Sequence, residues 1–163
     1  MNSVHSDLIV RVARFADAPL FWEWANDKEV RDNSWSPATV ELSRHLVWFK
    51  DKLESKDSKI YVLESGKDPV AQVRYDRKSR DEAEIDFSVS SKWRGKGVGT
   101  NALRLTREDA RSSLGVCRVV GVVKTNNVGS CRAFQKASFT EGDEREIHGQ
   151  PCRTFYWPQG VQR

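Results

Sequence analysis

The stretch of sequence that most restricts the fold is Arg94–Thr100, which has glycines at positions 95, 97 and 99. Apolar and polar residues alternate over Ala83–Val89 and predict a strand before it, and a helix is predicted after it, to about Ser113. Glycine removes Cβ clashes, so successive N–H groups can converge on one point near the positive end of a helix. Arg94 and Lys96 add full charges. The segment therefore predicts a loop that cradles an anion, with a pyrophosphate as the best fit.

Two familiar phosphate-binding motifs do not fit this loop. The P-loop requires Ser or Thr directly after its lysine, whereas Gly97 follows Lys96. The dinucleotide fingerprint requires a third glycine where Thr100 stands, and it belongs to the first strand–helix turn of a domain. A glycine-rich connection that only caps a helix remains the alternative.

The length and charge of the chain restrict its partners. A chain of 163 residues fits one domain, 1–163, with a folded core expected over about 8–157. Lys and Arg number 27 against 23 Asp and Glu, a formal net charge of +4, with no block of like charges. We therefore expect no nucleic-acid partner, and a small anionic ligand suits the modest basic surplus better.

The remaining composition indicates a protein of the reducing cytoplasm. The segment Met1–Ile9 lacks the apolar core of a signal peptide, and the longest apolar runs, such as Val119–Val123, are too short to cross a membrane. Cys117, Cys131 and Cys152 are widely spaced without a C-x-x-C pair. We expect reduced thiols, no metal site and no membrane contact.

Hydrophobic periodicity predicts a mixed α/β (α+β) domain of about six or seven strands and about four helices. Only one βαβ unit is clear, which argues against a doubly wound fold. Residues 30–37 are polar and are predicted to form a loop. Strands are predicted near 8–15, 60–64, 70–75, 83–89, 117–123, 140–147 and 153–157, and helices near 18–26, 39–53, 98–113 and 127–137.

The glycine-rich loop and the elements around it resemble a known family. The pattern Arg94-x-x-Gly97-x-Gly99 resembles the acyl-CoA-binding motif of the GNAT superfamily of N-acetyltransferases, and Asn127-x-x-Ser130 opens a matching later helix. The likeness extends in element order from about Leu8 to Trp157. It implies a GNAT-like fold with a central, mostly antiparallel sheet, a bulge in the fourth strand, and fourth and fifth strands that splay apart.

The resemblance also implies how acetyl-CoA, the acyl donor, would bind. The backbones of Phe87 and Val89 would pair with the pantetheine amides as a missing strand would. Asn127 would hold the arm from the other side, although it is equally suited to cap its helix, and the two roles are compatible. The implied cofactor-binding residues are Phe87, Val89, Arg94, Gly95, Lys96, Gly97, Val98, Gly99, Thr100, Asn127, Ser130 and Phe134.

Glu84 is the first candidate for the catalytic base. Acetyl transfer requires a group that takes a proton from the acceptor ammonium and a donor for the oxyanion, which the family draws from a backbone N–H, here that of Val89. The run Ala83-Glu84-Ile85 resembles the strand that carries the glutamate base of the histone-acetylating branch. His45 and His148 are rival bases by their chemistry, and Glu84 could instead bind substrate or pair with Arg74.

Two positions depart from the family pattern. Many members have a tyrosine on the last helix as general acid for the CoA sulfur, whereas Phe134 stands here and cannot donate a proton. The CoA thiolate is a weak base, with a pKa near that of cysteine at about 8.5, so it can leave without an acid. Tyr75, Tyr156 or water are the other options. Ser138 replaces a frequent glycine at a turn.

The acceptor site is the least specific part of the resemblance. The first two helices and their connection resemble acetyltransferases that act on nucleotide-linked amino sugars of polysaccharide biosynthesis, including the pseudaminic acid route. Aromatic faces stack on sugar and base rings, and arginine binds phosphate, with Arg31 and Arg74 as the candidates. The implied acceptor-binding residues are Trp24, Arg31, Asn33, Trp35, His45, Trp48, Arg74 and Tyr75.

Alternatives to this acceptor stay open. The two tryptophans Trp24 and Trp48 could simply pack between helices, and Arg31 could be solvated. The acceptor could be the N-terminal amine of a protein, as in the ribosomal-protein branch, or the chain could be a non-catalytic acyl-CoA-binding domain. A homodimer is compatible with the resemblance, and the sequence identifies neither the exact acceptor nor the general acid.

Overall fold

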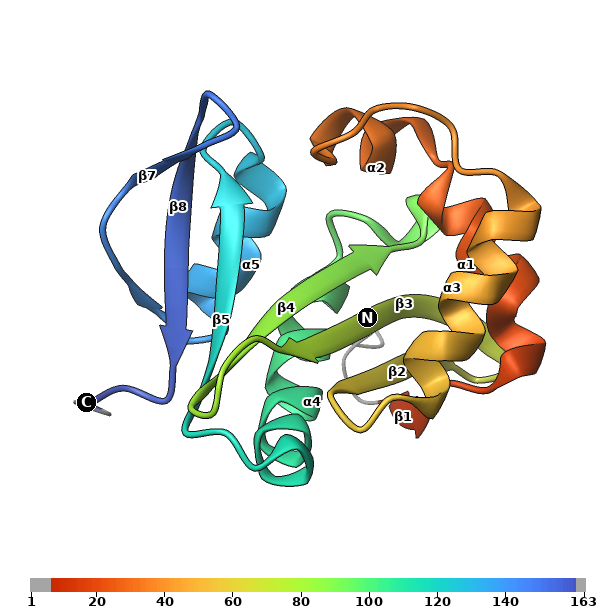
Figure 1. Cartoon of the computed structure of the whole chain (residues 1–163), viewed down its shortest axis with the longest axis horizontal. Coiled ribbons are helices and arrows are strands. Elements are labelled where there is room, and N and C mark those ends of the chain that lie inside the picture. The colour runs from red at the N-terminus through yellow and green to blue at the C-terminus, as the bar shows by residue number, and fades with distance from the viewer. Residues whose placement is uncertain (1–6, 161–163) are drawn as a thin grey trace.

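The computed structural model describes residues 7–160. A mixed sheet of eight strands runs through it, in the order β1-β2-β3-β4-β5-β8-β6, and β7 also pairs with β8. Figure 1 shows the strands fanning across the middle of the molecule. The strands are β1 (Leu8–Val12), β2 (Ser58–Ser65), β3 (Asp68–Arg77), β4 (Glu82–Val89), β5 (Arg118–Lys124), β6 (Thr140–Glu141), β7 (Arg145–Ile147) and β8 (Gln150–Trp157).

Helices cover both faces of the sheet. The larger core lies between the sheet and two helices, α4 and α5, and a smaller core lies between β2, α1 and α3 on the other face. Strand β2 serves both cores, because its alternate residues point to opposite faces. The helices are α1 (Ala18–Ala25), α2 (Lys28–Asn33), α3 (Leu42–Glu54), α4 (Val98–Leu114) and α5 (Val128–Lys136), with 3-10 turns at η1 (Phe15–Asp17) and η2 (Ser91–Trp93).

The only parallel pair among the strands described is β4–β5, and it is short. Its register joins Glu82 to Arg118 and ends where Ile85 meets Gly121. Beyond that point β4 continues against β3, and β5 continues against β8. Figure 1 shows the two strands diverging into an open V between β4 and β5. The splayed, mostly antiparallel sheet expected from the sequence is therefore confirmed.

Three local expectations were wrong. Part of the predicted loop 30–37 forms α2, because Asp27 caps its first turn by accepting from the N–H groups of Glu29 and Val30. The predicted strand 140–147 is broken into β6 and β7, which raises the strand count to eight. Strand β4 faces β3 in continuous register without the implied bulge; a register shift lies instead between Leu63 and Glu64 in the β2–β3 pair.

Candidate active site

One large cavity of about 1020 Å³ occupies the V between β4 and β5. Its walls include the glycine-rich loop, the start of α4 and one side of α5. They also include α1, α2 and α3 on the opposite face of the sheet. A single cavity therefore joins the predicted cofactor loop to the predicted acceptor residues, with the splayed strands between them.

The glycine-rich loop has the backbone shape that the sequence predicts. Gly95 and Gly97 have φ values of 72° and 78°, in the left-handed region, and Gly97 directly precedes α4. Gly99 lies so close to β4 that an added Cβ would stand 3.0 Å from a ring carbon of Phe87. The loop thus brings the first N–H groups of a helix of 17 residues to the floor of the cavity.

The free edge of β4 offers backbone groups to the same cavity. The N–H of Ser90 donates to the carbonyl of Val70 on β3 at 2.8 Å. Since successive main-chain groups of a strand alternate in direction, those of Phe87 and Val89 point the other way, toward the V. The carbonyl of Val89 accepts from Arg94 Nε at 3.1 Å. The N–H groups of Phe87 and Val89 therefore lie where an extended ligand could pair with them.

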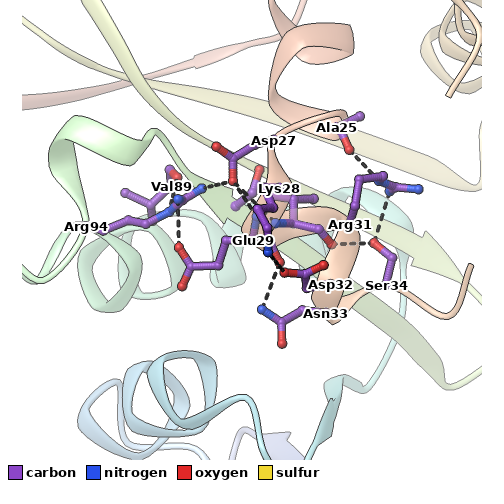
Figure 2. A network of polar contacts seen from close by, with 12 residues as sticks. Ala25, Asp27, Lys28, Glu29, Arg31, Asp32, Asn33, Ser34, Val89 and Arg94 are labelled. Atoms are coloured by element: carbon purple, nitrogen blue, oxygen red, sulfur yellow. Dashed lines mark hydrogen bonds and ion pairs between the residues drawn. The ribbon is translucent and has the colours of Figure 1, made fainter. Parts of the chain in front are cut away.

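Arg94 lies in an ion-pair network rather than free in the cavity (Figure 2). Its guanidinium is 2.7 Å from both Asp27 and Glu29, so it ties the glycine-rich loop to α2. Burial opposes ionisation of Asp27. The hydrogen bonds from Arg94 and from the N–H groups of Val30 and Glu29 outweigh burial and lower the pKa of this carboxyl. The Lys96 ammonium lies 5.3 Å from the centre of the Trp93 ring and is not part of the cavity wall. The role of Lys96 at a pyrophosphate therefore stays a prediction.

Helix α5 forms the opposite side of the V. Asn127 caps it by accepting from the N–H of Ser130 at 3.3 Å, and both residues line the cavity. Phe134 is 1% exposed, and its ring stacks on Phe155 at 5.1 Å. It packs so tightly on β5 that a Cβ at Gly121 would stand 2.3 Å from its Cζ.

No tyrosine of residues 7–160 lines the cavity, so neither alternative acid is in place. Tyr75 is fully buried in the larger core, where its hydroxyl lies 2.8 Å from the hydroxyl of Thr106. The expectation that Tyr75 contacts the acceptor is therefore wrong, because its side chain points to the α4 face of the sheet. Tyr156 lies on β8 beneath the guanidinium of Arg118.

Glu84 and Asp86 lie on the face of β4 that is turned toward the predicted acceptor residues. Asp86 is held by Gln72 Nε2 at 3.2 Å and by Arg74 at 3.7 Å. The carboxylate of Glu84 lines the cavity and forms no hydrogen bond or ion pair with residues 7–160, although its charge helps to raise the pKa of Arg74. Of the two carboxylates, Glu84 is therefore the one free to bind an incoming ammonium.

Arg74 is already neutralised by its neighbours. Its Nε donates to Asp76 at 2.7 Å, and its guanidinium lies 4.9 Å from the centre of the Trp48 ring. Burial alone would lower the pKa of Arg74, but the charges of Asp86, Asp76 and Glu84 raise it overall. Burial likewise opposes ionisation of Asp76, yet the charge of Arg74 and the hydrogen bonds from Lys52, Ser58 and Arg74 lower its pKa to about 2. Arg74 thus positions Trp48 and Asp86 rather than offering an uncompensated charge to a ligand.

Arg31 binds the backbone of its own segment instead of an open anion site. Its guanidinium donates to the carbonyls of Ala25, Ser36 and Ala38 and to the hydroxyl of Ser34. Asn33, also at the cavity, donates to the carbonyl of Glu29. The expectation that Arg31 and Arg74 face a second phosphate is therefore not supported, since both guanidinium groups have their partners within the fold.

The aromatic residues of the expected acceptor site do come together. Trp24, Trp35, His45 and Trp48 all line the cavity, and Trp35 and Trp48 are 44% and 37% exposed. Trp24 stacks on Phe21 at 5.7 Å, which is the packing role that the sequence left open for it. His45 lies 5.6 Å from Trp48, ring centre to ring centre.

The imidazole of His45 is held neutral by its surroundings. Burial lowers its pKa below the ordinary value of 6.5, although the contact of Nε2 with the carbonyl of Ala18, at 3.1 Å, raises it in part. A carbonyl oxygen only accepts, so Nε2 carries the proton and Nδ1 does not.

This histidine predicts a pH-dependent stability. Below pH 6.5 the unfolded chain binds a proton at His45 more readily than the folded one, so the free energy of unfolding falls as the pH falls. We expect the unfolding midpoint of the wild type in urea to fall more between pH 7 and pH 5 than that of His45→Gln. Parallel losses in the two proteins would contradict this prediction.

Several residues that line the cavity belong to none of the sequence motifs described above. Lys124 at the end of β5, Gln72 on β3 and Arg44 on α3 line the acceptor side, while Arg132 and Lys136 line the α5 side. The last two are four residues apart on α5, a spacing that places them on one face and could have been read as a basic stripe. In residues 7–160 no three His, Cys, Asp or Glu side chains gather as a metal site requires, and no helix is long and apolar enough to span a membrane.

The fold and this cavity define an acyltransferase of the GNAT class. Residues 7–140 match the acetyltransferase (GNAT) domain family, and the chain belongs to that family. No curated protein matches the sequence.

Solved structures share the fold at low sequence identity. The aminoglycoside acetyltransferase AAC(6')-Ib, in complex with paromomycin and acetyl-CoA, has a TM-score of 0.80 at 16% identity, over 94% of each chain. Spermidine N-acetyltransferase from Vibrio cholerae, with CoA and spermine, has a TM-score of 0.80 at 15% identity, over 93% of this chain and 95% of that one. The putative acetyltransferase YncA from Salmonella typhimurium, with acetyl-CoA, has a TM-score of 0.79 at 18% identity, over 96% of each. None of these is an enzyme of nucleotide-linked amino sugars.

Proposed function

We propose that this protein transfers the acetyl group of acetyl-CoA directly to a primary amine of a nucleotide-linked amino sugar. The observation that supports it is the single cavity that joins the glycine-rich loop to a wall of tryptophans and the free carboxylate of Glu84. One end suits a pyrophosphate and a pantetheine arm. The other suits a ring-shaped acceptor that presents an amine to the V between β4 and β5.

The donor end fits acetyl-CoA, which two of the similar structures hold. The N–H groups that begin α4 would bind the pyrophosphate, and those of Phe87 and Val89 would pair with the pantetheine amides. Arg132 and Lys136 are exposed on the cavity side of α5 and supply positive charge at the donor end. Asn127 keeps its amide NH₂ for the arm while its oxygen caps α5.

The chemistry needs few groups. Glu84, whose carboxylate has no hydrogen bond or ion pair within residues 7–160, accepts a proton from the acceptor ammonium, and the neutral amine attacks the thioester carbon. The oxyanion that forms is stabilised by the N–H of Val89 at the open edge of β4. The C–S bond then breaks and the thiolate leaves without an acid, because Phe134 offers none and a thiolate is a good leaving group. The nitrogen loses its second proton to water or to the departing thiolate, which leaves the amide neutral.

The acceptor end supports a sugar more than a polyamine. Trp24, Trp35 and Trp48 present flat faces of the kind that stack on sugar and base rings. The similar structures with paromomycin and spermine concern cationic acceptors, but at 15–16% identity their likeness extends to the fold alone. Here the acceptor side includes Lys124 and Arg44 beside its carboxylates.

A screen of acceptors tests the proposal. The full chain is given acetyl-CoA and, separately, a UDP-linked 4-amino sugar, the phosphate-free amino sugar, an aminoglycoside, spermidine and N-terminal peptides, and thiol release is followed. We expect the highest kcat/KM with the UDP-linked sugar. Higher turnover of peptides or spermidine would reject the sugar, and no acetyl-CoA binding by calorimetry would reject the catalytic proposal.

The network around Arg94 predicts an effect on the cofactor. Glu29 is 63% exposed and competes with a pyrophosphate for Arg94, whereas Asp27 holds that guanidinium from the cap of α2. We expect Glu29→Gln to tighten acetyl-CoA binding about two- to fivefold, the size of an exposed ion pair. Calorimetry measures it, with Asp32→Asn, which removes an ion pair to Lys28 on the same helix, as the control. Weaker binding by Glu29→Gln would contradict the competition.

A further inference from the structure

Lys124 is a buried cation at the acceptor end of the cavity, and the mechanism above does not use it. Its residue is 8% exposed, and its Nζ donates to the carbonyl of Ser34 at 2.8 Å. The same Nζ lies 5.3 Å from the centre of the Trp35 ring. Within residues 7–160 it forms no ion pair with a carboxylate. Its charge is stabilised by the carbonyl dipole of Ser34 and the ring face of Trp35.

The strand register places Lys124 on the acceptor face of the sheet. Glu84 lies opposite Val120 in the β4–β5 pair, and alternate residues of a strand share a face, so Val120 and Lys124 lie on the same side as Glu84. Lys124 is four residues beyond Val120, roughly 13 Å along the strand. The cation therefore stands well apart from the position where the amine would react.

The arginines that the sequence suggested for an anion have their donors satisfied within the fold, whereas Lys124 keeps donors that no residue of 7–160 satisfies. Arg31 is bound to its own loop, and Arg74 is paired with Asp76 and Asp86. Lysine retains two further N–H donors beyond the one that reaches Ser34. An exposed tryptophan beside those donors suits a flat ring, and the donors suit phosphate oxygens.

We propose that Lys124 and Trp35 bind the nucleoside diphosphate end of the acceptor, while Glu84 receives its amine. This inference rests on the proposed function and adds to it the residue that recognises the phosphate. It also accounts for specificity, because a buried ammonium with no counter-ion disfavours a polycation at the same place.

The test measures binding of UDP to the full chain by calorimetry with CoA present at saturation, so that the donor site is filled. Lys124→Gln keeps an N–H donor for Ser34 but removes the charge, and we expect its Kd for UDP to rise about tenfold or more. Lys124→Arg keeps the charge and is expected to restore most of the affinity. Lys59→Gln is the matched control, since Lys59 also lies over a ring, that of Tyr61, but outside the cavity.

Each other outcome is decisive. Equal UDP binding by the wild type and Lys124→Gln, or no UDP binding by the wild type, would overturn the inference. So would a loss of CoA affinity in Lys124→Gln with UDP binding unchanged, because the anion would then belong to the donor. Failure of the proposed function is seen separately, as absence of acetyl transfer to the phosphate-free amino sugar as well as to the UDP-linked one.

Discussion

Glu84→Gln is expected to lower kcat by about 10²- to 10⁴-fold, the usual contribution of a positioned base. The change keeps the size of the side chain and removes its ability to accept a proton. Because the carboxylate of Glu84 forms no hydrogen bond or ion pair within residues 7–160 and only adds to the charge around Arg74, the variant should still fold. The measurement is thiol release at saturating acetyl-CoA across pH, and the acidic limb of the wild-type profile should be absent in the variant.

Asp86→Asn is the matched control for that experiment. Asp86 stands two residues along on the same face of β4, but Gln72 and Arg74 hold its carboxylate. We expect its loss of kcat to be far smaller than that of Glu84→Gln. If the two variants lose activity equally, or if Glu84→Gln keeps the wild-type pH profile, Glu84 is not the base.

Gly121→Ala is expected to destabilise the protein strongly. The new Cβ would stand 2.3 Å from Cζ of Phe134, whose buried ring is packed against Phe155 and Phe139. Overpacking of this kind costs about 1–3 kcal/mol, and more where the neighbours cannot move. Urea unfolding measures the loss, and acetyl-CoA affinity should fall with it because Phe134 lines the cavity.

Two further variants separate this clash from a general effect of alanine. Gly129 in α5 has nothing within 4 Å of an added Cβ, so Gly129→Ala should stabilise the protein by about 0.5–1 kcal/mol. Phe134→Leu combined with Gly121→Ala should cost less than the sum of the single losses, because the smaller side chain leaves room for the methyl group. Additive losses would mean that the two residues do not meet as described.

The sequence predicted those parts of the site that depend on backbone. The alternating glycines can be read directly, since Gly95 and Gly97 need left-handed φ values and Gly99 needs a close approach to Phe87. The splay of β4 and β5 came from the family resemblance rather than from periodicity. Glu84 could be assigned to the acceptor face from the alternation of β4 alone.

Side-chain partners across the fold could not be read in the same way. Arg94 and Lys96 are equally basic in the sequence, yet one is paired with two carboxylates of α2 and the other lies on Trp93. Arg31 was expected to face a phosphate and Lys124 had no predicted role, because only the folded chain shows that Arg31 donates to its own segment while Lys124 lines the cavity. Tyr75 was expected at the acceptor together with Arg74, but successive residues of a strand point to opposite faces. Arg74 faces the cavity and Tyr75 faces the core.

The segment from Asp27 to Ser34 is anchored on both sides of the open V. Arg94, beside the end of β4, forms an ion pair with its Asp27, and Lys124, at the end of β5, donates a hydrogen bond to its Ser34. Strands β4 and β5 themselves are joined through only the four register pairs from Glu82 to Ile85. This segment therefore links the two strands beyond those pairs, across the open end of the V. A graft of the α2 segment from a relative, made to change the acceptor, should alter the affinity for the acyl donor as well.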